Sequence, residues 1–352
     1  MIELTPFLKQ LISLPGLSGH EAPVRTVIAE AWQPLVDELT TSKLGSLHGL
    51  RRGSGPEPRP SILLSAHMDA IGLIATTVVE GFIHFTQIGG IDPRILPGQP
   101  VTVYGRKELA GVVVQPADRL LPEAQKEKPV AMEYLVVDTG LPPQEVAALV
   151  RPGDLIVYAQ QPIDLAGETL AGHTLDNRAS VTAVTLCLQE LKHSNPAWDV
   201  WAVASVQEET VLGGAFTSPF DIRPTLAIAI DVTHAKGPGV SDYRGFALGE
   251  GPALGWGPNI HTPAFKALND LAEKLEIPHV MEPMPLHSGT DAMGIQVVAE
   301  GIPTLVVSIP LRYMHTPVET VALKDISRTA HLLAEFIARL EPDFMDKIAW
   351  DE

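Results

Sequence analysis

The stretch SILLSAHMDAIG, residues 61–72, begins as an apolar run and ends in polar residues followed by a glycine. A short apolar run with such boundaries is typical of a buried central strand in an α/β sheet. Residues two apart in a strand share a face, so we expect His67 and Asp69 to point into one cleft. The alternative is that both side chains are simply exposed at the end of the strand.

Three further runs have the same character: VWAVASVQ (200–207), TLAIAID (225–231) and TLVVSIP (304–310). Apolar residues at three- and four-residue spacing also predict several helices. These lie at about 3–14, 21–39, 177–193, 263–276 and 323–341. The pattern predicts an α/β fold in which the apolar runs form the central strands.

Residues 71–162 differ, with β-rich pieces broken by glycine and proline and one short helix candidate near 142–150. We predict that 71–162 is a small β-rich domain inserted into a main domain made of 1–70 and 163–352. The segment RRGSGPEPRP (51–60) is rich in turn-forming residues and is predicted to be an exposed hairpin loop.

The composition excludes several classes of protein. Hydrophobic residues make up 45% of the 352 residues and charged residues 19%, as in globular proteins. No apolar run reaches the roughly 18 residues of a membrane span, and the N-terminal segment lacks the order of a signal peptide, so we predict a cytoplasmic protein without a membrane partner. A net charge of −17 argues against a nucleic-acid partner.

The chain has one cysteine, Cys187. This rules out an intrachain disulfide framework and a zinc site built from several cysteines. Any metal site in this protein must therefore use histidines and carboxylates.

Two acids follow directly after the apolar run that ends near 205, in SVQEETVLGGA (205–215). Paired carboxylates at a buried strand end are rare without a cation that compensates their charge. Adjacent residues of a strand face opposite ways, so one of Glu208 and Glu209 could bind a metal while the other addresses water. An exposed acidic loop is the alternative.

Three further polar residues stand at comparable places. Asp176 precedes the predicted helix 177–193, where it could cap the helix or bridge two cations at the centre of a two-metal site. Asp231 ends one apolar run and His315 lies just beyond another. Because the carboxyl ends of strands in α/β sheets meet at one crevice, we expect these side chains to converge on a site for zinc- or cobalt-like ions. We interpret His173 as a loop residue.

In their order and wording, several motifs resemble the M42 family of dinuclear metallo-aminopeptidases, which includes the tetrahedral aminopeptidases. These motifs are AHMDAIG, LDNR, QEETVLGGA, AIDVTHA, SGTDA and SIPLRYMHTPVE. The resemblance covers nearly the whole chain. It implies a mixed-sheet catalytic domain of the zinc-peptidase type and an inserted PDZ-like β-domain that helps subunits assemble into homo-oligomers, commonly dimer-built dodecamers.

The resemblance also implies roles for individual residues. Two divalent ions, zinc or cobalt, would be bound by five ligands: His67, Asp176, Glu209, Asp231 and His315. His67 and Asp231 would hold one ion, Glu209 and His315 the other, and Asp176 would bridge them. Glu208 would be the general base and Asp69 would support His67. The substrates would be peptides with a free N-terminus.

The sequence departs from the family pattern at Ala70, where many members have an acidic or amide residue, and Asn177 is a variant of the LDNR motif seen in place of Asp. Two other functions remain open. One is a glycoside hydrolase, which needs two carboxylates flanking the scissile bond. That hypothesis gives the histidines no role. A non-catalytic metal-binding assembly protein would give Glu208 no role.

Overall fold

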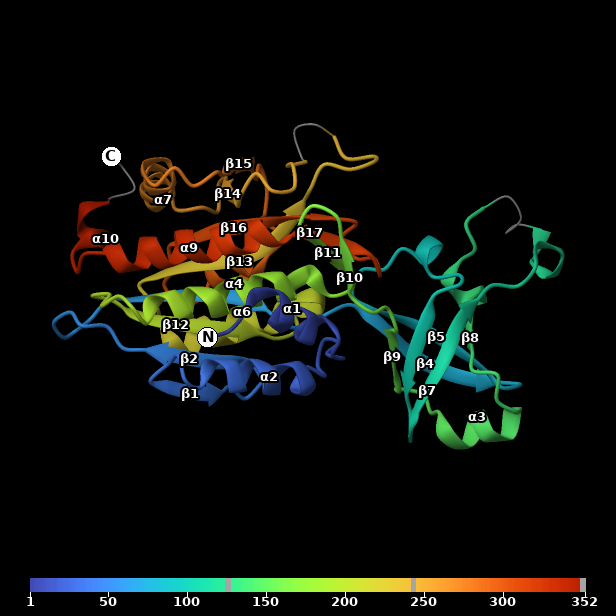
Figure 1. The fold of residues 1–352 in the computed structure, drawn as a ribbon. Coiled ribbons are helices and arrows are strands. Elements are labelled where there is room, and N and C mark those ends of the chain that lie inside the picture. The colour runs from blue at the N-terminus through green and yellow to red at the C-terminus, as the bar shows by residue number, and fades with distance from the viewer. Residues whose placement is uncertain (124–127, 242–244, 349–352) are drawn as a thin grey trace.

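A computed structural model describes residues 1–123, 128–241 and 245–348. Figure 1 shows a large body, in which helices pack on an extended sheet, and a smaller β-structure at its side. None of the helices in the described ranges is long and apolar enough to cross a membrane.

Within these ranges eleven strands form one sheet. Its order is β1 (Glu38–Thr41), β2 (Leu47–Arg51), β12 (Asp199–Ser205), β3 (Ser61–His67), β13 (Leu226–His234), β16 (Thr304–Arg312), β17 (Glu319–Ala322), β11 (Thr169–Gly172) and β10 (Ile163–Leu165), with β14 (Ala253–Trp256) paired to β16 and β15 (Val280–Pro283) paired to β14.

The four expected central strands are confirmed as β3, β12, β13 and β16, and they lie side by side and parallel. The flanking pairs are antiparallel, so the sheet is mixed, as expected. Because parallel neighbours run in the same direction, the residues that end these four strands meet at one edge of the sheet.

Helices cover both faces of the central strands. One face packs against α4 (Leu175–Leu191), with α1 (Leu4–Ile12), α2 (Ala22–Trp32) and α9 (Leu323–Arg339) around it, and the other packs against α6 (Gly213–Ile222) and α8 (Asp291–Ile295). The remaining helices of the main body are α5 (Glu208–Val211), α7 (Thr262–Lys274) and α10 (Phe344–Lys347). Successive side chains of β3 alternate between the two cores: Ile62 and Leu64 belong to the first, and Leu63 belongs to the second.

Two expectations about the N-terminal part are wrong. The helix expected over 21–39 ends at Trp32, because the chain turns into the edge strand β1 that pairs with β2. The segment 51–60 is not a hairpin loop, because β12 lies between β2 and β3 and pairs with both. Local sequence carries no information about a strand that comes from far along the chain.

The smaller β-structure is a closed barrel of six strands in the described residues, in the order β4 (Gly72–Val79), β5 (Phe82–Ile88), β8 (Val136–Asp138), β7 (Glu108–Val114), β6 (Pro100–Tyr104) and β9 (Leu155–Tyr158). It has its own apolar core, which includes Ile83, Val103 and Val137. The short helix expected near 142–150 is α3 (Pro143–Leu149). The PDZ-like character that the resemblance implies stays a prediction.

Candidate metal centre

The predicted site residues come together where the central parallel strands end. His67 is the last residue of β3, Asp231 lies in β13, and Glu208 and His315 follow β12 and β16 by three residues. With Asp176, from the start of α4, they line a cavity of ≈ 210 Å³. Its full lining is His67, Asp176, Glu208, Glu209, Asp231, Val232, Gly289, Met314 and His315.

The carboxylate of Asp176 faces two imidazoles with two different oxygens. Its Oδ1 lies 3.2 Å from Nε2 of His67, and its Oδ2 lies 3.3 Å from Nε2 of His315. The backbone of Asp176 is non-helical, with φ −78° and ψ 103°, and the partners of its carboxylate are the two imidazoles. The carboxylate therefore stands between the two imidazoles.

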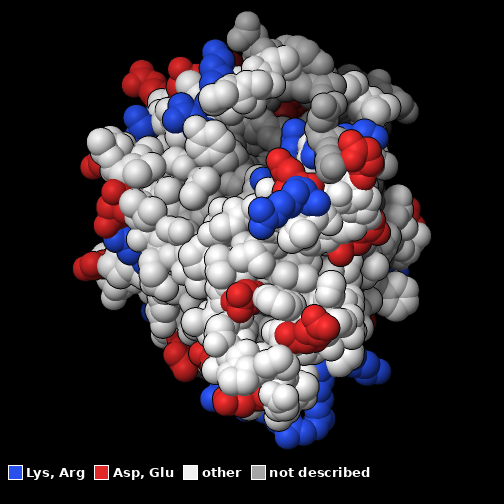
Figure 2. All heavy atoms as spheres, turned by 90° about the vertical axis from the view of Figure 1, so that its right-hand side faces the viewer, with Lys and Arg blue, Asp and Glu red and all other residues white. Residues whose placement is uncertain are grey.

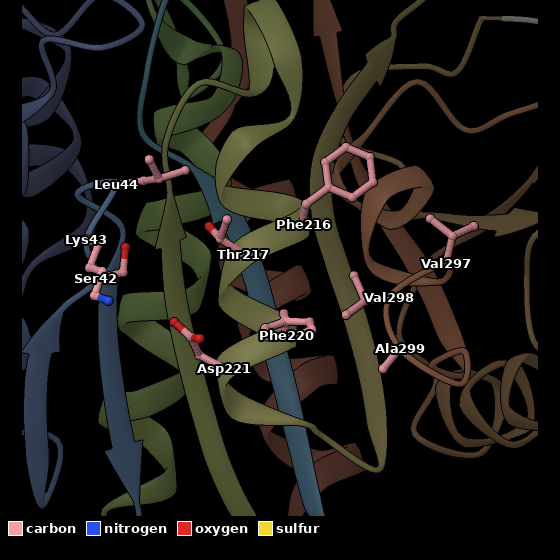
Figure 3. A pocket seen from close by; sticks show the side chains of 10 residues that line it. All are labelled: Ser42, Lys43, Leu44, Phe216, Thr217, Phe220, Asp221, Val297, Val298 and Ala299. Carbon is pink, nitrogen blue, oxygen red and sulfur yellow. The ribbon is translucent and has the colours of Figure 1, made fainter.

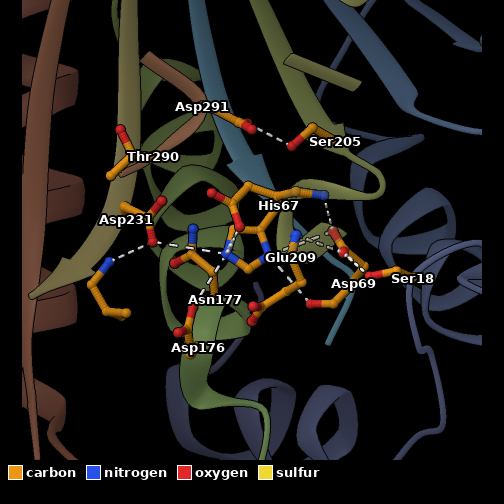
Figure 4. Close-up of polar contacts among 12 residues, drawn as sticks. Ser18, His67, Asp69, Asp176, Asn177, Ser205, Glu209, Asp231, Thr290 and Asp291 are labelled. Carbon is orange, nitrogen blue, oxygen red and sulfur yellow. Dashed lines mark hydrogen bonds and ion pairs between the residues drawn. The ribbon is translucent and has the colours of Figure 1, made fainter. Parts of the chain in front are cut away.

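Each imidazole has a second carboxylate beside it. Nε2 of His315 is 3.4 Å from Oε2 of Glu209. Nε2 of His67 is 3.8 Å from Oδ1 of Asp231 (Figure 4). Metal–ligand bonds of about 2.0–2.1 Å place the ligand atoms of a tetrahedral zinc ion roughly 3.3 Å apart. The ligand atoms of His67, Asp176 and Glu209 also lie within 4.8 Å of one another, so this donor set fits a cation.

The carboxylates of the cavity are in an unfavourable electrostatic position without a cation. Burial raises the pKa of Glu208 to about 7, and the negative charges of Asp291 and Asp176 add to this effect while His67 opposes it. Burial followed by neighbouring carboxylates also holds the pKa of Glu209 and of Asp231 well above the ordinary range. Removing such groups from water is costly unless a positive charge compensates them, so the cluster favours cation binding.

The pKa of the His67 imidazole is also raised, but burial opposes this shift. Burial alone would lower the pKa of His67, but the charge of Glu208 and a hydrogen bond with Asp176 raise it well above its usual value. A cation would have to displace the proton from Nε2, because only the neutral imidazole is a ligand.

Asp69 makes two sets of contacts in this arrangement. Its Oδ1 lies 3.6 Å from Nδ1 of His67, and its main-chain oxygen lies 3.2 Å from the same nitrogen. Its carboxylate also accepts hydrogen bonds from the main-chain N–H groups of Glu208 and Glu209, at 3.0 and 3.2 Å, and from the hydroxyl of Ser18 at 2.6 Å. Burial opposes its charge, but the contacts with His67 lower its pKa overall. Asp69 thus faces His67, as expected, and also fixes the turn of the acid pair.

Three buried acids near the site escaped the sequence analysis. Glu319 accepts hydrogen bonds from the N–H groups of Asp176 (3.0 Å) and His315 (2.9 Å). Glu21 accepts from the N–H groups of Gly19 (2.7 Å) and Gln207 (3.3 Å). These acids hold the backbone next to predicted ligands.

The third is Asp291, which accepts hydrogen bonds of 2.6 Å from the hydroxyls of Ser65 and Ser205. Figure 4 shows the bond with Ser205. It therefore ties together β3 and β12, the strands that precede His67 and the acid pair. Asp291 lies in the motif SGTDA and Glu319 in the motif HTPVE. These motifs could therefore have identified both acids as residues near the site. Glu21 stands before a predicted helix and had no such signal.

His173, interpreted as a loop residue, lies between β11 and α4 and is buried. Burial, followed by the nearby Arg178, lowers its pKa to about 3, so it is neutral. Its ring contacts that of Tyr158 in the barrel edge to face, at 6.2 Å between centroids. It links the barrel to the main body, and it lines a small hollow together with Asp176 and Glu209.

The chain is similar to known aminopeptidases over nearly its full length. A family model described as M42 glutamyl aminopeptidase matches residues 45–332. The lysyl aminopeptidase of Pyrococcus furiosus is 33% identical over 95% of this chain and 97% of its own length.

Two solved structures have the same fold. The TET aminopeptidase of a marine Thaumarchaeota archaeon has a TM-score of 0.92 and 28% identity, and 98% of each chain is covered. The TET1 peptidase of Pyrococcus horikoshii, described as assembling into a tetrahedron or a large octahedral shell, has a TM-score of 0.83 and 28% identity over 96% of this chain and 100% of that one.

The raised pKa values of Glu208, Glu209 and Asp231 predict that cation binding releases protons. Carboxylates with raised pKa values are partly protonated near neutral pH, so the affinity for Zn²⁺ should fall as the pH is lowered from 8 to 6, by about tenfold per pH unit for each proton displaced. Calorimetric titration of the chelator-treated protein with Zn²⁺, in buffers of different ionisation enthalpy, measures the protons released. A binding enthalpy independent of the buffer would contradict the prediction.

Proposed function

This chain belongs to the M42 family of aminopeptidases, and from that premise we propose that it removes N-terminal residues from peptides by means of two divalent cations bound among its convergent histidines and carboxylates. The observation that carries the proposal is the two-sided environment of Asp176. One of its oxygens faces His67 and the other faces His315, and each imidazole has a further carboxylate beside it.

We assign His67 and Asp231 to one cation, His315 and Glu209 to the other, and Asp176 to both. Nitrogen and carboxylate ligands of this kind suit zinc or cobalt. When bound, two such ions supply a water molecule of lowered pKa and Lewis-acid positions for the scissile carbonyl and for a free α-amine of the substrate.

We assign the role of general base to Glu208. Its raised pKa of about 7 suits a group that takes a proton from water and passes it to the leaving amine near neutral pH. Its Oε2 lies 3.8 Å from Nε2 of His67, so its carboxylate faces the same cavity as the ligands. Its main-chain N–H is held by Asp69, which limits the freedom of the turn. Asp69 in turn is assigned to keep His67 in the tautomer that leaves Nε2 free to bind a cation.

A glycoside hydrolase would give the two imidazoles of the cavity no role. That chemistry needs two carboxylates on opposite sides of a glycosidic bond, about 5–9.5 Å apart, and has no use for two imidazoles beside a shared carboxylate. A non-catalytic metal-binding protein would use the same ligands, and only the role of Glu208 separates it from an enzyme.

We further propose that 71–162 is an inserted domain that assists self-association, with 1–70 and 163–352 as the catalytic domain. The barrel strands have an apolar core of their own, which supports a separate unit. The barrel end of the molecule carries acidic and basic side chains interspersed with uncharged area (Figure 2). A dimer-built homo-oligomer, such as a dodecamer, is consistent with the tetrahedron described for the Pyrococcus horikoshii relative and with the dodecamer described for a further solved TET structure.

The substitution Glu208→Gln should leave both cations bound and lower kcat by about 10²–10⁴-fold, because the amide is nearly isosteric but cannot accept a proton. Metal analysis and steady-state kinetics on the same preparation measure the two effects. Near-wild-type turnover at full metal content would show that another group is the base.

Asp176→Ala should abolish retention of both cations, whereas His315→Ala should mainly weaken one, because only Asp176 is assigned to both. Metal content per chain after desalting measures this, with circular dichroism as the control for folding. Two cations retained by Asp176→Ala would rule out the bridging assignment.

A peptide with a free α-amine should be shortened one residue at a time, and the same peptide acetylated at its N-terminus should be cleaved at least about a hundredfold more slowly. Acetylation removes the lone pair that positions the first carbonyl, and such positioning supplies much of the rate. Mass spectrometry of timed digests identifies the products. Early internal fragments, or equal rates on both peptides, would speak against the proposed exopeptidase action.

A further inference from the structure

A second hollow lies on the main body, away from the metal centre, with a volume of ≈ 440 Å³. Figure 3 shows α6 in its middle, the turn 42–44 on one side and the segment 297–299 on the other. We call it the α6 hollow. It is lined by Ser42, Lys43, Leu44, Phe216, Thr217, Phe220, Asp221, Val297, Val298 and Ala299.

The exposed side chains of the α6 hollow are unusually apolar. Phe216 and Phe220 are 43% and 56% exposed, and Leu44 and Val297 are 44% and 63% exposed. The two phenylalanines are four residues apart and so lie on the same face of the helix. A surface helix normally presents polar residues to water, and a contiguous exposed apolar patch marks a contact with another molecule.

We propose that the α6 hollow is a contact surface between two copies of this chain, related by a two-fold axis. The inference rests on the proposed homo-oligomer. The surface has both parts that a self-complementary contact needs, since phenylalanine side chains project beside a hollow that can receive them. In a two-fold contact each copy places its Phe220 against the hollow of the other.

A second contact surface outside the barrel agrees with the symmetry of closed shells. One two-fold contact per subunit closes a dimer, and one head-to-tail contact closes a ring or grows a filament. A closed tetrahedral shell therefore needs at least two different contact surfaces on each subunit. No lining residue of the α6 hollow belongs to the barrel strands, so the hollow is a separate surface.

The charges at the hollow favour a second copy over an unlike partner. Lys43 and Asp221 are both exposed, and they carry opposite charges on the same lining. A two-fold axis can bring Lys43 of one copy near Asp221 of the other, twice in each contact. At the rim Arg223 lies 4.5 Å from the centre of the Phe220 ring and 3.2 Å from Glu300, so this cation is already paired within the chain.

The test compares the mass of the assembled full-length protein with that of matched variants by light scattering after size-exclusion chromatography. Phe220→Glu should lower the mass at least twofold, while the apolar control Phe220→Leu keeps it.

Lys43→Glu and Asp221→Lys alone should each weaken the assembly, because like charges then meet across the axis. The double variant Lys43→Glu/Asp221→Lys should regain at least part of the mass. Rates per chain on an aminoacyl chromogenic substrate check that each variant is folded.

The outcomes separate this inference from the proposed function. Unchanged mass in Phe220→Glu, with an assembled wild type, would overturn the α6 contact alone and leave the hollow to a different kind of partner. If Phe220→Glu does not fold, the charge-reversal set decides, and a double variant no larger than the singles would overturn the two-fold pairing. A monomeric wild type at micromolar concentration would remove both the proposed homo-oligomer and this contact, and would leave the aminopeptidase proposal untouched.

Discussion

The structure depends on keeping several carboxylates close together inside the protein, at the ends of parallel strands. Asp176, Glu208, Glu209 and Asp231 line one cavity, and only two imidazoles stand among them. Like charges in a desolvated site repel one another, which is why burial and mutual proximity raise the pKa of three of these acids. A flexible chain would relieve that repulsion by moving the groups apart. The register of the sheet prevents this, because Ser205 pairs with His67 and Asp231 pairs with Ser308.

The loops beyond the strands are held by a second group of acids. Glu21 accepts a hydrogen bond from the main-chain N–H of Gln207. Asp69 accepts hydrogen bonds from the N–H groups of Glu208 and Glu209. Glu319 accepts them from the N–H groups of Asp176 and His315. Several of these segments have unusual backbone conformations, since Thr174, Gln207 and His315 have φ values of 63°, 60° and 62°. Non-glycine residues in this region cost on the order of 1 kcal/mol or more and persist where the surroundings enforce them. The hydrogen bonds of Gln207 with Glu21 and of His315 with Glu319 provide that enforcement at the candidate metal centre.

The barrel is attached at the same edge of the sheet. The chain leaves β3 at His67 and enters β4 at Gly72. After β5 the chain passes close to the candidate metal centre, since a Cβ added at Gly90 would lie 3.3 Å from Nδ1 of His315. A unit proposed to assist assembly is therefore in contact with the site proposed for chemistry. The α6 hollow lies on the main body, so self-association can use both parts of the chain.

The sequence by itself determined the four central strands, most of the helices and the residues that converge on the cavity. The periodicity of strands and helices is a local property of the sequence. A polar residue that ends an apolar run can therefore be placed at the end of a strand from the sequence alone. The tertiary structure alone decided that β12 separates β2 from β3, that the insertion closes into a barrel, and that Glu21, Asp291 and Glu319 support the site. These features depend on pairings between residues far apart in the chain, such as Glu21 with Gln207. No local pattern encodes such a pairing, because its free energy exists only when the two segments are brought together.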